Sequence, residues 1–250
     1  MTTPIAGTMV AEDTMNETYG WSRRMLGPAA VTAANVVMGF SSILMAADGR
    51  YRLAVLLLLA AIVLDMMDGR LARKLRVTSK LGQELDSFSD AISFGLAPAF
   101  LVQRAILEPL GIFGLLIAAA YLLAAIFRLA RFNLVVGEHS KERRTLGVPT
   151  PIAAVYLMAL VLMREHVTPE VAVAVVLAMA VLMMSRIRLP DLVGRGMVGW
   201  ALLIGMANYL IFVARPNWLT VTWWNLWNGV IVLASWWENR QLRLFHATSE

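Results

Sequence analysis

Four aspartates lie close together in the sequence, at spacings that predict a shared site. Asp65 and Asp68 are three residues apart, and Asp86 and Asp90 are four residues apart. Residues three or four apart on a helix lie on one face, so each pair presents its carboxylates to the same side. Grouped carboxylates suit a hard divalent cation such as Mg²⁺ or Mn²⁺. The spacing therefore predicts a site for one or two such ions, with all four aspartates as candidate ligands.

A simpler interpretation is that these acids are helix-end charges paired with the nearby Arg70, Arg73 and Lys74. That interpretation is adequate for one aspartate, but it explains the convergence of four less well. Carboxylates in a low-dielectric site repel one another and do not all ionise unaided. Ionisable groups at membrane depth cost several kcal/mol unless they are paired, so they usually mark function.

The elements that must position these acids are apolar helices. Hydrophobic residues make up 59% of the 250-residue chain and charged residues 16%, compared with about 25% charged in a typical soluble domain. The apolar residues gather in runs that approach the ~20 residues needed to span a bilayer core. We predict an all-α, polytopic membrane helix bundle of about eight transmembrane helices, six plus a C-terminal pair. The expected spans are 28–47, 51–72, 81–106, 111–133, 149–164, 169–185, 196–214 and 218–237.

The short connection 73–81 makes the second and third helices an antiparallel hairpin, which brings the two carboxylate pairs together. In the C-terminal pair, the tryptophans are expected to form aromatic belts at the membrane interfaces; they are Trp218, Trp223, Trp224, Trp227, Trp236 and Trp237.

The distribution of positive charge predicts the orientation. If the N-terminus is inside, 17 of the 22 Lys and Arg residues fall on the inner side and 5 on the outer side. This imbalance predicts that both termini and the aspartates lie at the cytoplasmic face of a bacterial-type cytoplasmic membrane. The outer five are Arg50, Arg52, Arg104, Arg164 and Arg215.

The net charge of +5 suits cationic loops against anionic lipid headgroups, and no nucleic-acid-binding motif accompanies it. We therefore expect membrane lipids as partners and no nucleic acid. The chain has no cysteine, which excludes disulfides and thiolate metal sites. Residues 1–25 are read as a polar tail and not as a signal peptide, because they lack an apolar segment.

The aspartates belong to a longer pattern. The chain reads Asp65-x2-Asp68-Gly69-x2-Ala72-Arg73-x8-Gly82-x3-Asp86-x3-Asp90. At every fixed position this resembles the signature of the CDP-alcohol phosphotransferase family. The resemblance assigns residues 26–215 to a membrane domain of that family, with its active site in 65–90. Residues 216–250 remain a Trp-rich helix and tail.

Three further segments resemble the integral-membrane phosphatidylserine synthases of bacteria and archaea. They are Ser93-Phe94-Gly95-Leu96-Ala97-Pro98-Ala99, Arg128-Leu129-Ala130-Arg131-Phe132-Asn133 and Gly147-Val148-Pro149-Thr150-Pro151. The first helix, with Thr32, Asn35 and Gly39, is also similar to that group. The resemblance implies CDP-diacylglycerol and L-serine as substrates, a divalent-metal-dependent transfer of the phosphatidyl group, and a homodimer.

The resemblance also implies roles for individual residues. Asp90 is the expected general base, in addition to its place among the metal ligands. The residues expected at the nucleotide are Asn35, Asp65, Gly69, Ala72, Arg73 and Gly82. Those expected at the serine or the phosphate are Ser93, Phe94, Arg128, Arg131 and Asn133.

Two alternatives remain open at this point. The first is the same reaction class with another acceptor, such as glycerol 3-phosphate, inositol phosphate or choline. A phosphorylated acceptor would need extra cations in the pocket, and the loops 141–144 and 186–195 contain them. A cation or proton transporter with buried carboxylates is a more distant alternative, because the sequence shows no internal repeat and the acids sit near one surface.

Overall fold

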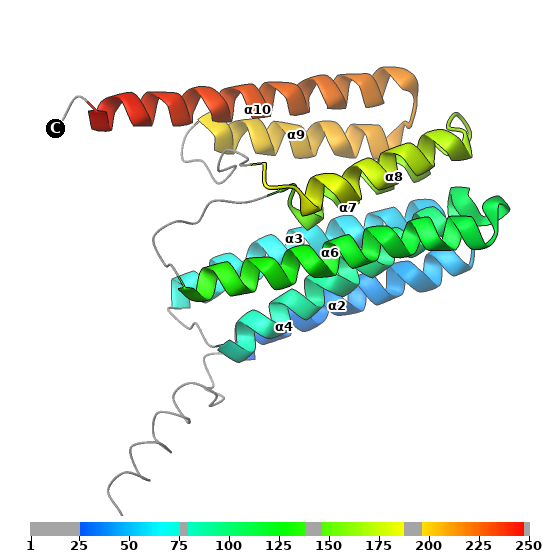
Figure 1. Cartoon of the computed structure of the whole chain (residues 1–250), viewed down its shortest axis with the longest axis horizontal. Helices are drawn as coiled ribbons and strands as arrows, with labels where there is room; N and C mark the ends of the chain where they lie inside the picture. Colours follow the sequence, from blue (N-terminus) through cyan, green and yellow to red (C-terminus); the bar gives the residue numbers. More distant parts are fainter. Residues whose placement is uncertain (1–25, 76–79, 139–146, 188–196, 248–250) are drawn as a thin grey trace, which may run out of the picture.

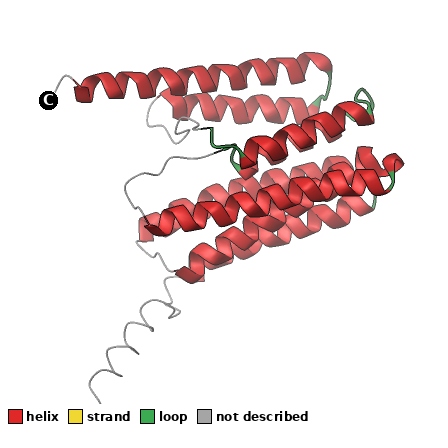
Figure 2. Ribbon diagram, in the orientation of Figure 1, coloured by secondary structure: helices red, strands yellow, loops and turns green. Residues whose placement is uncertain are grey.

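The structure is a computed structural model that describes residues 26–75, 80–138, 147–187 and 197–247, and within these ranges it is entirely helical, with no strand (Figures 1 and 2). Residues 80–110 form five consecutive helical segments that together make one rod, the third along the chain. With this one, eight helical rods run roughly side by side. Seven of them are α2 (Leu26–Ala47), α3 (Tyr51–Leu75), α6 (Ile112–Glu138), α7 (Thr150–Leu162), α8 (Pro169–Met184), α9 (Met197–Ala214) and α10 (Trp218–Ala247).

The predicted all-helical fold is confirmed, and most predicted helix ends lie within a few residues of the observed ones. Proline marks two starts: Pro149 is the N-cap of α7, and Pro169 opens α8. Proline is tolerated there because the first N–H groups of a helix have no intrahelical partner. The largest difference is at the C-terminal end of the last helix: α10 ends at Ala247, whereas the predicted helix ends at residue 237.

The third rod departs from a regular α-helix. It consists of α4 (Lys80–Asp90), the π-helical η2 (Ala91–Leu96), α5 (Ala97–Val102), the π-helical η3 (Gln103–Leu107) and the 3₁₀ turn η4 (Glu108–Leu110). A π turn replaces the i→i−4 hydrogen bonds of an α-helix, and π turns are frequent at functional sites. The hydroxyl of the fully buried Tyr121 donates to the carbonyl oxygen of Phe94 at 3.0 Å. A side chain from α6 therefore provides a partner for a backbone carbonyl within η2.

The rods pack through small residues. The most extensive contacts pair α2 with α3, α6 with α8, and α9 with α10, and many of the fully buried positions are alanines. The approach is closest between Gly39 of α2 and Ser93 of η2, where a Cβ on residue 39 would lie 2.9 Å from the Cα of Ser93. Close backbone approach through small residues is the usual means of helix association in membranes. It holds η2 directly against α2.

The surface of the bundle is that of a membrane protein. Large apolar side chains remain exposed along the outside of α6, for example Leu123 at 65% and Phe113 at 72%. Contiguous exposed apolar surface of this kind is unusual on a soluble monomer. By length and composition, three described segments are suited to crossing a bilayer: Gly27–Ala47, Leu81–Leu110 and Ile112–Leu134. Shorter apolar helices follow at Thr150–Leu162, Pro169–Met184 and Ile204–Ala214.

The start of α2 and the end of α10 lie at the same end of the bundle (left in Figure 1). The same figure places the C-terminal end of α3 and the start of α4 at that end. The opposite end carries the α2–α3, α7–α8 and α9–α10 connections.

One tryptophan differs from the sequence-based expectation. Trp224 is 3% exposed and lies among Tyr156, Tyr209 and Phe212, with ring centroids 5.1 to 6.1 Å away. Its burial joins α10 to α7 and α9, so Trp224 belongs to the protein core and not to an interfacial belt. Trp218 and Trp223 are each 58% exposed, as expected of belt residues.

Candidate active site

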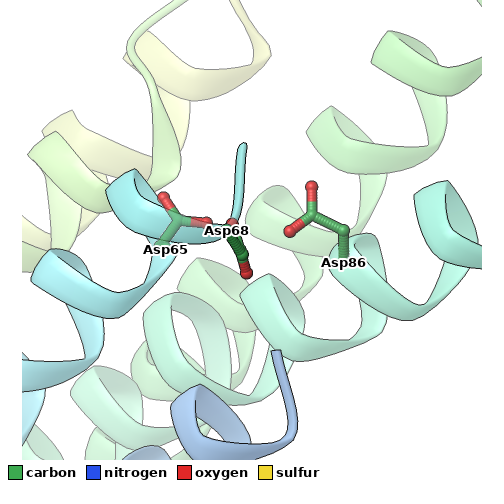
Figure 3. A group of neighbouring side chains, drawn as sticks. All are labelled: Asp65, Asp68 and Asp86. Carbon is green, nitrogen blue, oxygen red and sulfur yellow. The ribbon is translucent and has the colours of Figure 1, made fainter. Parts of the chain in front are cut away.

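Three of the four predicted carboxylates form one cluster. Asp65 and Asp68 project from the last turns of α3, and Asp86 projects toward them from α4 (Figure 3). One carboxylate oxygen from each lies within 4.8 Å of the other two. Three acidic oxygen ligands at this separation fit a hard divalent cation, and they match the oxygen donors that Mg²⁺ and Mn²⁺ prefer.

Asp90 lies one helical turn after Asp86 and adjoins this cluster. Its carboxyl group is within hydrogen-bonding reach of Asp65, and it also interacts electrostatically with Asp68 and Asp86. One of its oxygens, Oδ1, is buried and has no hydrogen-bond partner among the described residues. Four acids this close repel one another strongly, so the arrangement requires protons or bound cations to compensate their charge. Three of the four aspartates thus lie together and Asp90 adjoins them; their predicted roles as metal ligands stay a prediction.

Thr32 of α2 supports the cluster from a third helix. Its hydroxyl lies 3.1 Å from Oδ2 of Asp68 and 3.1 Å from the carbonyl oxygen of Pro28, one turn earlier in α2. The backbone N–H of Gly69 also lies near the Asp68 carboxylate and favours its negative charge. Asp68 is only 5% exposed, so these two groups orient a buried side chain. Partners that orient metal ligands in this way usually affect metal affinity.

The variant Thr32→Val keeps the shape of the side chain and removes the donor to Asp68. We expect Mn²⁺ affinity to fall roughly 10-fold to 100-fold, the range typical of lost outer-sphere partners. Calorimetric titration of the purified protein with Mn²⁺ measures this. The matched control is Thr222→Val, an exposed threonine of α10, which should bind as the wild type does. Equal affinity in Thr32→Val and the control would show that Thr32 does not position Asp68.

The predicted nucleotide residues lie on α2, α3 and α4, the helices that carry or contact the cluster. Asn35 lies one turn after Thr32 in α2; it is fully buried, and neither polar atom of its side chain has a partner among the described residues. Gly69 directly follows Asp68, and Gly82 is exposed near the start of α4. Ala72 and Arg73 belong to α3, but their side chains lie outside the described part of the structure. An unpartnered buried amide is costly, so Asn35 is suited to bind a polar ligand.

The two predicted arginines have different surroundings. Arg128 is 8% exposed, its Nε has no hydrogen-bond partner among the described residues, and it interacts electrostatically with Asp90. Arg131 donates to the carbonyl oxygens of Met183, Met184 and Ser185 at 2.9 to 3.2 Å. A cation at the C-terminal end of a helix is favourable, so Arg131 holds α6 against α8. Arg128 is the arginine that the structure brings to the aspartates.

The other three predicted acceptor residues contact neighbouring helices. Ser93 donates to the carbonyl oxygen of Asn35 at 3.1 Å. The side chain of Phe94 is fully buried. Asn133 donates to the hydroxyl of Ser87, beside Asp86, at 3.0 Å. These contacts connect α2 with η2 and α6 with α4, and so they fix the positions of the helices that carry Asp86 and Asp90.

Two buried or partly buried polar residues, Thr32 beside the cluster and Thr150 in α7, were not among the residues predicted to bind a ligand. Thr32 was noted only as part of the first helix, yet it contacts Asp68. Thr150, at the start of α7, is fully buried and its hydroxyl has no partner among the described residues. Gly147, three residues before it, has φ +73°, and a Cβ there would lie 3.0 Å from the carbonyl oxygen of Leu182. The sequence signal for this chain entry into α7 is the spacing Gly-x-Pro-Thr-Pro, which runs from Gly147 onward.

The alternative acceptors would use loops 141–144 and 186–195, and these loops lie outside the described residues apart from Arg186 and Ile187.

Comparison with known proteins agrees with this site. A profile described as CDP-alcohol phosphatidyltransferase matches residues 25–186, which contain all four aspartates. A CDP-diacylglycerol–serine O-phosphatidyltransferase of Helicobacter pylori is 34% identical over 172 residues, covering 66% of this chain and 72% of its own length. The Bacillus subtilis protein of the same name is 34% identical over 163 residues, covering 65% of this chain and 89% of its own length.

The similarity also reaches archaea. An archaetidylserine synthase of Methanothermobacter thermautotrophicus is 34% identical over 175 residues, covering 68% of this chain and 71% of its own length. The matched profile spans more than half of the chain and includes the whole acidic cluster, so the chain belongs to the CDP-alcohol phosphatidyltransferase family.

Proposed function

We propose that this protein transfers the phosphatidyl group of CDP-diacylglycerol to the hydroxyl group of L-serine, giving phosphatidylserine and CMP. The observation that carries the proposal is the convergence of Asp65, Asp68, Asp86 and Asp90 between two membrane helices. The relatives named as serine phosphatidyltransferases support serine as the acceptor. The archaeal relative supports serine with a different lipid.

Asp65, Asp68 and Asp86 would hold one or two Mg²⁺ or Mn²⁺ ions. A bound ion supplies neutralisation of pyrophosphate charge and stabilisation of the departing CMP. Asn35, Gly69, Ala72, Arg73 and Gly82 would bind the cytidine and its phosphates, the glycines and alanine by leaving the backbone accessible. Catalysis of such a transfer depends mainly on positioning and charge compensation.

Asp90 would accept the proton of the serine hydroxyl. As that oxygen forms its bond to the phosphorus that carries the diacylglycerol, the bond from this phosphorus to the CMP oxygen breaks, and CMP departs with the electron pair. The unpartnered Oδ1 of Asp90 is the atom available for the proton. A general base must lie within hydrogen-bond reach of the proton that it removes. The burial of Oδ1 also limits access of water, which would compete with serine.

The carboxylate of serine would bind Arg128. A buried guanidinium group needs an anionic partner, and the unpartnered Nε of Arg128 leaves a donor for one. The unpartnered hydroxyl of Thr150 is a second candidate contact for the acceptor. Ser93, Phe94, Arg131 and Asn133 would act on the acceptor by positioning the helices around it.

The variant Arg128→Gln is expected to raise the KM for serine roughly 10-fold to 100-fold, because a hydrogen bond to a charged group contributes about 1.5–3 kcal/mol. Initial rates at varied serine concentration measure this. The KM for CDP-diacylglycerol should change little, and Arg128→Lys should recover part of the loss. A rise in the KM for CDP-diacylglycerol alone would instead place Arg128 at the lipid phosphate.

We also propose eight membrane spans, cytoplasmic termini, and an active site that opens to the cytoplasmic face. The chain contains no cysteine, so single-cysteine variants test this directly. The variants Arg186→Cys and Asp48→Cys suit this test, and both positions are exposed. Arg186 follows α8, whose end accepts hydrogen bonds from Arg131 near the C-terminal end of α6, and Asp48 lies in the α2–α3 connection at the opposite end of the bundle (Figure 1). In intact cells, a membrane-impermeant maleimide should label Asp48→Cys and not Arg186→Cys. The reverse pattern would invert the proposed orientation.

The proposed reaction is tested by CMP release from the purified protein with CDP-diacylglycerol and Mn²⁺ or Mg²⁺. Serine, glycerol 3-phosphate, inositol 1-phosphate, inositol and choline are compared as acceptors. Release only with serine is the expected result. Release with a different acceptor would retain the reaction class and discard serine. A folded, metal-loaded protein that releases CMP with none of them would favour the transport alternative.

The family resemblance also leads us to propose a homodimer, and light scattering of the protein in detergent measures its oligomeric state.

A further inference from the structure

A second polar site lies at the end of the bundle opposite to the aspartates. There the α2–α3 connection, the end of α7 and the α9–α10 connection line an open cavity of about 590 Å³. Figure 1 shows these connections together at the end away from the start of α2. Along α3, Tyr51 at this cavity is 14 residues from Asp65, which corresponds to about 21 Å at 1.5 Å per residue. The cavity is therefore separate from the candidate active site.

The lining of the cavity is positively charged. Arg50, Arg52 and Arg164 contribute guanidinium groups, and Glu165 is the acidic residue among the lining residues. These arginines are three of the five basic residues that the sequence assigns to the outer side. Outer connections of membrane proteins are usually poor in such residues. Three of them around one cavity create a local field that attracts anions.

The three arginines are committed to the fold to different degrees. Arg52 donates to the carbonyl oxygens of Val213 and Ala214 at the end of α9, at 3.0 and 2.5 Å. Arg164 lies over the ring of Tyr51, 5.2 Å from its centroid, and pairs with Glu165 at 3.3 Å. The side chain of Arg50 has no hydrogen bond or ion pair within the described part of the chain. At least one full positive charge thus remains uncompensated in the cavity.

The surroundings of the cavity are amphiphilic. Leu53 and Leu162 line it beside the arginines. His166, also in the lining, has its ring 6.2 Å from that of Trp218 in an edge-on arrangement, and Trp218 is 58% exposed. An exposed tryptophan next to charged groups is typical of the level of lipid headgroups. A ligand with a phosphate and an adjoining apolar part would match both halves of this surface.

We propose that this cavity binds the phosphate of an anionic phospholipid from the leaflet opposite to the active site. Arg50 and Arg164 contact the phosphate oxygens, because guanidinium groups match phosphate in geometry and charge. Arg52 holds the end of α9 beside them, and Leu53 and Leu162 face the part of the acyl chains nearest to the phosphate. The same phosphate chemistry would also accommodate inorganic phosphate, so the test separates these two sources.

The test counts lipids that remain bound to the delipidated, full-length protein in native mass spectra after addition of phosphatidylglycerol or phosphatidylcholine. The wild type should retain phosphatidylglycerol in preference. Arg50→Gln should weaken this retention about fivefold, since each basic residue near anionic lipid contributes about 1 kcal/mol. Arg50→Gln with Arg164→Gln should reduce it to the phosphatidylcholine level. The single variant is not expected to affect folding, because the Arg50 side chain has no described contact to lose.

The matched control is Arg104→Gln. Arg104 lies at the same end of the bundle, is paired with Glu108 and does not line the cavity, so phosphatidylglycerol retention should be unchanged. Displacement of the lipid by millimolar inorganic phosphate would show that the phosphate group alone is recognised; resistance to it would show that the acyl chains contribute. Equal retention of the two lipids by the wild type, or equal retention of phosphatidylglycerol by the wild type and the double variant, would overturn the proposal. The readout involves no turnover, so it is independent of the proposed reaction.

Discussion

Replacing Asp68 with asparagine should lower CMP release by at least about 10³-fold and abolish most Mn²⁺ binding. The asparagine keeps an oxygen ligand and the shape of the side chain, but it removes one negative charge from a three-carboxylate cluster. It also leaves the buried position of Asp68 unchanged, so lost charge and not altered packing causes the effect. Stabilisation of charge that develops in the transition state is usually the largest single contribution to catalysis.

Two measurements on Asp68→Asn distinguish loss of metal from loss of fold. Calorimetric titration with Mn²⁺ should show no saturable binding at concentrations that saturate the wild type, while thermal unfolding in detergent stays cooperative. Glu84→Gln is the matched control, because Glu84 is an exposed acid of α4 outside the cluster. Wild-type Mn²⁺ affinity in Asp68→Asn would contradict the assignment of Asp68 as a ligand.

The second large effect is expected for Asp90→Asn. An amide cannot accept the serine proton, so kcat should fall by roughly 10²-fold to 10⁴-fold, the usual contribution of a general base. Metal affinity should fall less than in Asp68→Asn, because Asp90 is not among the three closest oxygen ligands. Rates at saturating serine and CDP-diacylglycerol, together with the Mn²⁺ titration, measure both quantities.

Asp48→Asn is the control for this variant. Asp48 follows α2 at the opposite end of the bundle and is exposed, and its replacement should leave kcat unchanged. If Asp90→Asn loses Mn²⁺ binding as completely as Asp68→Asn does, Asp90 acts mainly as a metal ligand. If it retains full activity, the proton of serine is removed by another group.

The helices and the acidic cluster were predictable because both follow from local spacing. Runs of apolar residues determine where a bilayer-length helix forms, and intervals of three and four residues determine which side chains share its face. The short connection after α3 then requires the second pair of acids to face the first. None of these steps depends on contacts between residues distant in sequence.

The π-helical segments were not predictable in this way. The sequence 81–106 reads as one continuous apolar helix, and nothing in its periodicity separates η2 from the α-helix around it. The hydrogen bond from Tyr121 to the carbonyl of Phe94 comes from another helix, 27 residues later. Likewise, the pattern gave Arg128 and Arg131 equal weight, because a spacing of three says nothing about which one faces the end of α8. Trp224 was misplaced because a tryptophan-rich segment resembles an interfacial belt unless its partner rings are known.

The π turn in η2 has a consequence for the length of the chain between the site and the core. A π turn accommodates one residue more than the α-helical turn that it replaces. Deleting a single residue from Ala91–Leu96 would therefore restore a regular helix and leave α4 in nearly the same rotation relative to α5. If the segment instead kept all its residues and formed an α-helix, α4 would be rotated relative to α5 by about 100° about the helix axis, the angle that one residue occupies. Asp86 and Asp90 would then turn away from α3, while Ala97, Leu101 and Val102 kept their places in the core. The direction of two carboxylates therefore depends on the π-helical hydrogen bonding of this segment.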